Sequence, residues 1–176
     1  MKIVSRSVND TIKLGKVIAR NLKSGDIICL LGELGSGKTI LVKGIAEGLG
    51  IKRERIISPS FVLIRQHYQG RLPLYHFDLY RLSLPSAILG LGYEEYFYNE
   101  AVTVIEWADR LKYLLPKEFL KIDLFFKTHT QRLLKLTAKG SRYKKLLRIS
   151  RKKFMLNANY RKSSATKIGG SAKHFG

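Results

Sequence analysis

Apolar residues recur along this chain at two spacings, one typical of helices and one typical of buried strands. Helical spacing over 14–22 follows Asp10, which can cap the first turn of a helix. An unbroken apolar run at 27–31 predicts a buried parallel strand, and helical spacing returns over 41–49. The region therefore predicts a helix, a strand and a second helix in that order.

Shorter apolar runs, separated by turn residues, follow this region. A hairpin is predicted where the runs at 61–64 and 72–76 are joined by Gln69-Gly70. The β-branched run at 101–105 predicts a second buried strand. The remaining predicted elements are a turn with a short helix at 85–95 and late strands at 120–126 and 133–136.

The segment between the first strand and the second helix fits the phosphate-binding pattern G-x-x-x-x-G-K-[ST], from Gly32 to Thr39. Gly35 and Gly37 let backbone N–H groups converge on a polyanion because they carry no Cβ. Lys38 brings positive charge to the β- and γ-phosphates of ATP, and the Thr39 hydroxyl can ligate Mg²⁺. The predicted fold is α/β, a single P-loop NTPase domain of three layers with a central, mostly parallel sheet. The loop residues expected at the nucleotide are Glu33, Leu34, Gly35, Ser36, Gly37, Lys38 and Thr39.

Two carboxylates that end other apolar runs are candidates to complete this site. Glu106 follows the run at 101–105, where it would face the loop across the sheet and complete the Mg²⁺ shell; the alternative is a surface acid. Asp78 is expected to orient water or touch the metal shell, or else to cap a helix or pair with a cation. The turn at 58–60, Ser-Pro-Ser, presents two hydroxyls, as does a switch segment that senses the γ-phosphate.

Composition narrows the remaining possibilities. A chain of 176 residues suits one α/β domain. No run approaches the roughly 18–20 apolar residues of a membrane span, and we find no apolar segment of the signal-peptide type. The single cysteine, Cys29, falls in a predicted strand, so neither a disulfide framework nor a cysteine-rich metal site is available. We expect a cytoplasmic protein.

The net charge of +20 is concentrated in the last part of the chain. Residues 1–123 carry a net +5, whereas residues 124–176 hold 15 Lys and Arg and no acid. Because such a sequence buries little apolar surface, we expect a P-loop ATPase domain at 1–138 and a basic, low-complexity, disordered extension at 139–176. The extension is interpreted either as an electrostatic arm for RNA or as a solubilising tail.

Several motifs together resemble one family. They are the loop at 32–39, Ser-Pro-Ser-Phe at 58–61, His-Phe-Asp-Leu-Tyr-Arg-Leu at 76–82, Leu-Gly-Tyr-Glu-Glu-Tyr-Phe at 91–97 and Val-Ile-Glu-Trp at 104–107. In this order and spacing they resemble the bacterial TsaE (YjeE) family, over roughly residues 5–138. The resemblance implies the ATPase component of tRNA threonylcarbamoyladenosine biosynthesis. In that family the ATPase acts with TsaB and TsaD in threonylcarbamoylation of adenosine 37, and ATP hydrolysis supports turnover of the complex without transferring the group.

The resemblance also implies roles for individual residues. Lys38, Ser60 and Asp78 would be catalytic, while Thr39 and Glu106 would hold Mg²⁺. The family usually has Thr where this chain has Ser60, and the hydroxyl is preserved. The other positions that match family residues near the nucleotide are Thr11, Trp107 and Arg132.

Three alternatives come from other classes of protein. A small-molecule or nucleotide kinase would share the loop, but it needs an acceptor pocket and usually an arginine-bearing lid, for which Arg81 and Arg110 are the possible donors. A GTPase would carry an Asn-Lys-x-Asp run, which is absent from the sequence. An RNA-binding module acting through the basic extension would leave the phosphate-binding loop unexplained.

Overall fold

The computed structural model describes the backbone of residues 1–97 and 100–168, and within these ranges the side chains up to Phe154. The elements are β1 (Lys2–Ser5), α1 (Val8–Ala19), β2 (Ile27–Leu31), α2 (Lys38–Gly48), the 3-10 helix η1 (Arg53–Arg55), β3 (Ile64–His67), β4 (Leu74–Asp78), α3 (Pro85–Leu89), α4 (Tyr93–Phe97), β5 (Val102–Glu106), the 3-10 helix η2 (Ala108–Leu114), β6 (Phe119–Phe126), β7 (Arg132–Lys139) and α5 (Ser141–Ile168).

The strands form one seven-stranded sheet in the order β1-β7-β6-β2-β5-β4-β3. The four central strands, β6, β2, β5 and β4, are parallel to one another. The outer pairings, β1 with β7, β7 with β6 and β3 with β4, are antiparallel. The predicted parallel strands thus form the centre of the sheet. The carboxyl ends of β2, β4 and β5 meet at one edge of it, and an open α/β sheet binds its ligand at this edge.

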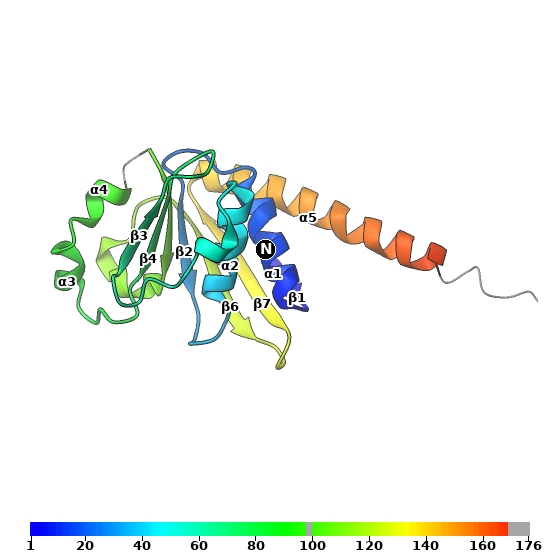
Figure 1. The fold of residues 1–176 in the computed structure, drawn as a ribbon, viewed down its shortest axis with the longest axis horizontal. Helices are drawn as coiled ribbons and strands as arrows, with labels where there is room; N and C mark the ends of the chain where they lie inside the picture. The colour runs from blue at the N-terminus through cyan, green and yellow to red at the C-terminus, as the bar shows by residue number, and fades with distance from the viewer. Residues whose placement is uncertain (98–99, 169–176) are drawn as a thin grey trace, which may run out of the picture.

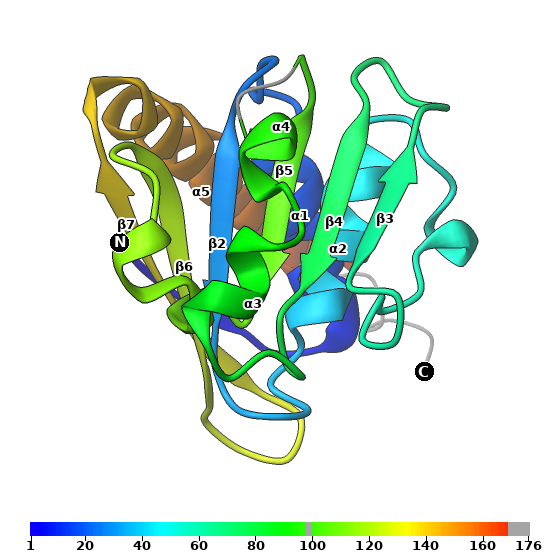
Figure 2. The same ribbon diagram turned by 90° about the vertical axis from the view of Figure 1, so that its left-hand side faces the viewer.

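Helices cover both faces of the sheet, which gives the predicted three layers (Figure 1). Figure 2 shows α3 and α4 in front of the sheet and α1, α2 and α5 behind it. Each face has its own apolar core, one beneath α1, α2 and α5 and the other beneath α3, α4 and η2. Among the described residues, no helix combines the length and the apolar character that crossing a membrane requires.

The beginning of the chain differs from the prediction in two details. Strand β1 was not predicted, because its four residues have only two buried side chains. Helix α1 begins after Ser7, whose hydroxyl accepts a hydrogen bond from the Asp10 N–H at 3.1 Å. Asp10 instead accepts one from the Arg6 N–H at 3.2 Å, so Ser7 caps the helix while Asp10 fixes the chain that leads into it.

The predicted hairpin is confirmed, but its first strand begins later than expected. β3 starts at Ile64, and Phe61 before it is 82 % exposed. Leu63, with φ of 65°, redirects the chain between them. Apolar character at Phe61 therefore marks an exposed turn next to the site rather than the core of a strand.

The expected disorder after residue 139 is wrong for residues 141–154. This segment is the first half of α5, and its Tyr143 and Leu146 side chains belong to the core beneath α1 and α2. Figure 1 shows α5 running across α1 and projecting beyond the sheet. Residues 169–176 of the predicted extension lie outside the described residues.

Candidate functional site

The phosphate-binding loop connects the carboxyl end of β2 to the first residue of α2, Lys38, as the motif requires. Gly37 precedes the helix in a left-handed conformation, with φ of 101°, and no side chain caps this helix terminus. The N–H groups of the first turn of α2 are thus left for a ligand. Leu34, at the tip of the loop, is 70 % exposed, while Ser36 is buried.

Lys38 is held within the loop by three contacts. Its Nζ donates hydrogen bonds to the carbonyl oxygens of Gly32 at 2.7 Å and Glu33 at 2.9 Å. The same atom lies 3.8 Å from the ring centroid of Trp107. Burial lowers the pKa of Lys38 below its ordinary value, against the opposing effect of nearby carboxylates, of which Glu106 and Asp78 are the two largest. A bound phosphate would place a further anion directly against this cation.

Glu106 receives hydrogen bonds from two directions at the end of β5. The Thr39 hydroxyl, in the first turn of α2, donates to both carboxylate oxygens at 2.9 Å. His76, from β4, places its Nε2 2.7 Å from Oε1 of the same carboxylate. Glu106 is 2 % exposed and His76 is fully buried. His76 was missed as a site residue, because one histidine in an apolar strand gives no signal of what it faces.

A hydroxyl and a carboxylate are hard oxygen ligands of the kind that Mg²⁺ takes, and Mg²⁺ usually completes its shell with waters and substrate phosphates. The pair formed by Thr39 and Glu106 fits this ion, since both groups lie beside the loop that would hold the phosphates. No group of three or more His, Cys, Asp or Glu that could hold a metal occurs among the described residues. An ion here would therefore depend on the nucleotide for part of its coordination.

Asp78 ends β4 and pairs in register with Glu106 across the sheet. Its Oδ2 accepts hydrogen bonds from the hydroxyls of both Ser58, at 2.5 Å, and Ser60, at 2.6 Å. Its Oδ1 accepts one from the Tyr80 N–H at 3.0 Å. Among the described residues Asp78 neither caps a helix nor forms an ion pair; it holds the serine turn beside the site. Ser58 and Ser60 make the same contact with Asp78, although the family resemblance implied a catalytic role only for Ser60.

Three further predicted residues differ in how closely they approach the phosphate-binding loop. Trp107 follows Glu106 in a left-handed conformation, and its ring lies over Lys38 and 5.0 Å from the Tyr80 ring. Arg132 reaches the loop and donates hydrogen bonds to the carbonyl oxygens of Ser36, at 3.2 Å, and Gly35, at 3.4 Å. Thr11 is buried in α1, where its hydroxyl pairs with Ser5 at 2.7 Å rather than with the loop.

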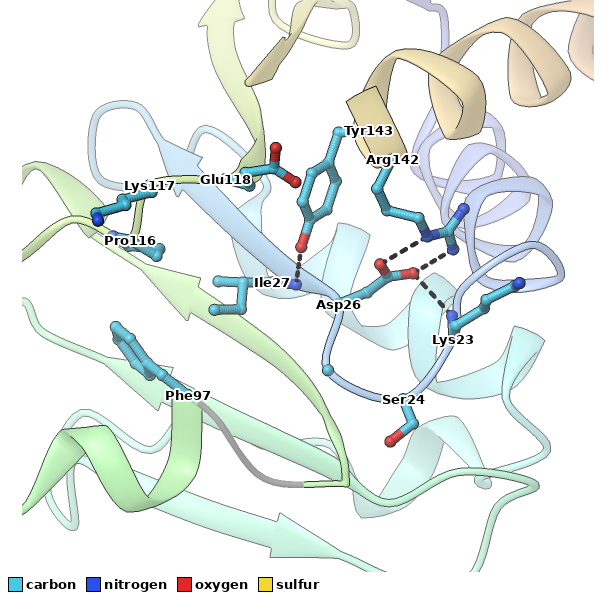
Figure 3. A pocket seen from close by; sticks show the side chains of 11 residues that line it. Lys23, Ser24, Asp26, Ile27, Phe97, Pro116, Lys117, Glu118, Arg142 and Tyr143 are labelled. Atoms are coloured by element: carbon cyan, nitrogen blue, oxygen red, sulfur yellow. Dashed lines mark hydrogen bonds and ion pairs between the residues drawn. The ribbon is translucent and has the colours of Figure 1, made fainter. Parts of the chain in front are cut away.

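A pocket of about 630 Å³ lies at the other end of β2, away from the loop (Figure 3). Asp26 and Arg142 form an ion pair in its wall, with Nη2 2.5 Å from Oδ2. None of the predicted site residues lines this pocket. The candidate site, at the edge of the sheet around the loop, is therefore separate from this pocket.

Comparisons with known proteins agree with this arrangement. Residues 5–134 match the family model described as threonylcarbamoyl adenosine biosynthesis protein TsaE. The Bacillus subtilis protein named tRNA threonylcarbamoyladenosine biosynthesis protein TsaE is 43 % identical over 143 residues, which are 80 % of this chain and 89 % of that protein. The protein of the same name from Treponema pallidum is 45 % identical over 124 residues, 70 % of this chain and 90 % of its own length.

A solved structure extends the agreement to the fold. The crystal structure of Bacillus subtilis YdiB superposes with a TM-score of 0.76 at 38 % identity, covering 87 % of this chain and 95 % of that one. The family model ends at Leu134 in β7, before α5 begins. From the loop, the paired strand-end carboxylates and these matches together, the chain belongs to the TsaE family.

Proposed function

We propose that this protein is a Mg²⁺-dependent ATPase that acts with homologues of TsaB and TsaD in threonylcarbamoylation of adenosine 37 of tRNA. The names of its relatives support the pathway. The contact that carries the proposal is the Thr39 hydroxyl on Glu106, because it joins the loop to an acidic strand end as a nucleotide–metal site needs. The proposal includes a cytoplasmic location.

In this proposal, the loop N–H groups and Lys38 bind the phosphates of ATP. Lys38 would move its hydrogen bonds from the carbonyl oxygens of Gly32 and Glu33 toward the β- and γ-phosphates. Thr39 and Glu106 would hold Mg²⁺, which neutralises charge that develops on the phosphates. Trp107 would lie beside the nucleotide, and Arg132 would keep the loop in shape through its carbonyl contacts.

Hydrolysis requires a water oxygen to attack the γ-phosphorus while the bond to the β-phosphate oxygen breaks, which yields ADP and phosphate. Asp78 would accept a hydrogen bond from that water. In the present structure Oδ2 of Asp78 is already engaged by Ser58 and Ser60. The proposed switch follows: the γ-phosphate draws a serine hydroxyl away, and the freed carboxylate oxygen then orients water. Turnover would depend on partners that favour this rearrangement.

A kinase is the weaker alternative, because neither candidate lid arginine contacts the loop among the described residues. The Arg81 guanidinium lies 4.1 Å from the centroid of the Phe61 ring. Arg110 lies 3.9 Å from the carboxylate of its neighbour Asp109. Arg81 therefore already has a partner, whereas the buried Nε of Arg110 has only this distant carboxylate and no hydrogen bond among the described residues.

The proposal is tested by ATP hydrolysis with purified TsaB and TsaD homologues, with each partner omitted in turn. Lys38→Ala and Glu106→Ala should each abolish the stimulated activity, the first through phosphate binding and the second through the metal. Lys52→Ala and Glu54→Ala, which remove the same charges at exposed positions, should leave it unchanged. Full activity in either site variant would refute the assignment, and phosphate transfer to an added acceptor would favour the kinase.

A further inference from the structure

Helix α5 has two opposite faces over its first half. The side chains packed toward the domain recur at helical spacing and are Tyr143, Leu146, Leu147, Ser150 and Phe154. Seven of residues 141–154 are exposed, and six of these seven are Lys or Arg. At about 100° per residue, five of these cations fall within an arc of roughly 120° opposite the buried face. We call them the basic stripe: Lys144, Lys145, Arg148, Arg151 and Lys152.

The first turn of α5 fixes this face relative to the domain. The Tyr143 hydroxyl oxygen accepts a hydrogen bond from the Ile27 N–H at 2.6 Å, at the start of β2 (Figure 3). Burial raises the pKa of Tyr143 to about 12, so the phenol stays neutral. Arg142 donates to both carboxylate oxygens of Asp26, which is 3 % exposed. The orientation of the stripe is therefore set by packing and is not that of a freely rotating tail.

The stripe works against the stability of its own helix. Lys144 and Arg148, and likewise Arg148 and Lys152, are like charges four residues apart, an arrangement that destabilises a helix. No acidic residue occurs in the first turn, where the helix dipole favours one, or anywhere else in α5. A surface that serves solubility mixes both signs of charge. The repulsion within a face that carries only cations is relieved when a polyanion binds to it.

Nucleic acid fits this face better than a lipid surface. An amphipathic helix that lies on a membrane inserts its apolar face, but here that face is packed against the domain. The stripe extends about 12 Å along the helix from Lys144 to Lys152, at 1.5 Å per residue, and no aromatic side chain is exposed on residues 141–154. Such a surface contacts a phosphate backbone and reads no bases.

We propose that the basic stripe of α5 binds the phosphate backbone of tRNA; the choice of tRNA among RNAs rests on the proposed function. The stripe begins at the amino end of β2, whereas the phosphate-binding loop follows its carboxyl end. The proposed RNA contacts therefore lie at the opposite end of β2 from the nucleotide site. The family model ends before α5, so that match carries no expectation for this surface.

The test compares two variants of the full chain that lose four charges each. The stripe variant carries Lys144→Gln, Arg148→Gln, Arg151→Gln and Lys152→Gln. The control variant carries Lys52→Gln, Arg53→Gln, Arg55→Gln and Arg65→Gln, exposed positions in or near η1 and β3 at the other edge of the sheet. Binding of fluorescently labelled tRNA transcript is measured by anisotropy between about 50 and 200 mM salt, the range in which phosphate contacts dominate the salt dependence.

The stripe variant should bind tRNA on the order of 10²-fold more weakly at 0.1 M salt, and its slope of log affinity against log salt should fall by about 3, at roughly 0.7 per lost contact. The control variant should change the slope by less than about 1. Equal losses in both variants would overturn the proposal, because net charge alone would then explain binding. Binding to phosphatidylserine vesicles that only the stripe variant loses, with tRNA binding intact, would overturn it in favour of a membrane.

Three further measurements separate this proposal from others. Circular dichroism checks that α5 still forms, and the charge-preserving changes Arg148→Lys and Arg151→Lys should retain tRNA binding. Trp107 is the single tryptophan, so its fluorescence reports ATP binding independently. If ATP fails to bind while the stripe variant still loses tRNA, the proposed ATPase function fails and the RNA surface stands. If ATP binds and the stripe variant keeps its affinity for tRNA, only the proposed RNA surface is rejected.

Discussion

Replacing Gly32 by alanine tests the geometry from which the phosphate-binding loop is built. Gly32 has a φ of 143°, a backbone conformation that L-residues rarely adopt. A Cβ at this position would overlap the carbonyl oxygen of Leu124 and lie 2.8 Å from Oγ of Ser36. Leu124 belongs to β6, which is paired with strands on both sides, so its backbone has little freedom to move.

The expected cost has two parts. An alanine forced into this conformation costs about 1–3 kcal/mol. Displacing the neighbouring backbone costs about 1–3 kcal/mol more, as overpacking does elsewhere. The sum of about 2–6 kcal/mol corresponds to a fall in melting temperature of roughly 5–20 °C for a chain of this size. Because the Gly32 carbonyl also accepts the Lys38 hydrogen bond, ATP affinity should fall with stability.

Gly35→Ala is the matched control in the same loop. Its φ of 74° is also left-handed, but an added Cβ would make only an ordinary contact, 3.7 Å from the Phe126 ring. It should therefore cost only the conformational strain, about 1–2 kcal/mol. Thermal unfolding followed by circular dichroism measures both variants, and Trp107 fluorescence measures ATP binding. If Gly32→Ala lowers the melting temperature no more than Gly35→Ala, the close approach to β6 is not what fixes the loop.

Three other expectations concern single positions. Asp78→Ala should bind ATP normally by Trp107 fluorescence yet lose stimulated turnover, since its proposed role is to orient water; normal turnover would make Asp78 a structural acid. ATP affinity should fall as pH rises through the lowered pKa of Lys38, below the ordinary 10.5, because the neutral amine no longer attracts phosphate, and Lys38→Arg should remove that dependence. Leu146→Ala, at a fully buried position of α5, should cost about 2–5 kcal/mol in urea unfolding, whereas Arg148→Ala should cost little; equal small losses would mean that α5 contributes nothing to the fold.

Much of the site was predictable because its signals are local. The loop motif, the strand before it and the helix after it lie within one short stretch, and Glu106 and Asp78 each end an apolar run. His76 and the equivalence of Ser58 with Ser60 were not predictable in this way. Their roles depend on which strands are neighbours and on the direction in which each side chain points. The sequence alone does not show that β4 pairs with β5.

The error on residues 141–154 has a different physical origin. Charge content argues for disorder only when apolar burial is too small to offset chain entropy. Here four of the five apolar positions, 143, 146, 147 and 154, fell on one helical face, and they pack against a preformed surface instead of building a core of their own. Asp26 adds an anchor for Arg142 from a distant part of the chain. Tertiary contacts therefore determine that this segment is helical. Overall composition does not reveal them, because it ignores where along the helix each apolar residue falls.

The hydrogen bonds of Thr39 show how the site is prepared before any ligand binds. The hydroxyl donates its proton to Glu106, so its lone pairs remain free to face a cation. His76 holds the same carboxylate from the other side, which limits its rotation away from the loop. An orienting partner of this kind typically affects metal affinity by roughly 10–100-fold when removed. If the proposed metal binds here, His76 would act on it through Glu106, and strand β4 would help to position the carboxylate at the end of β5.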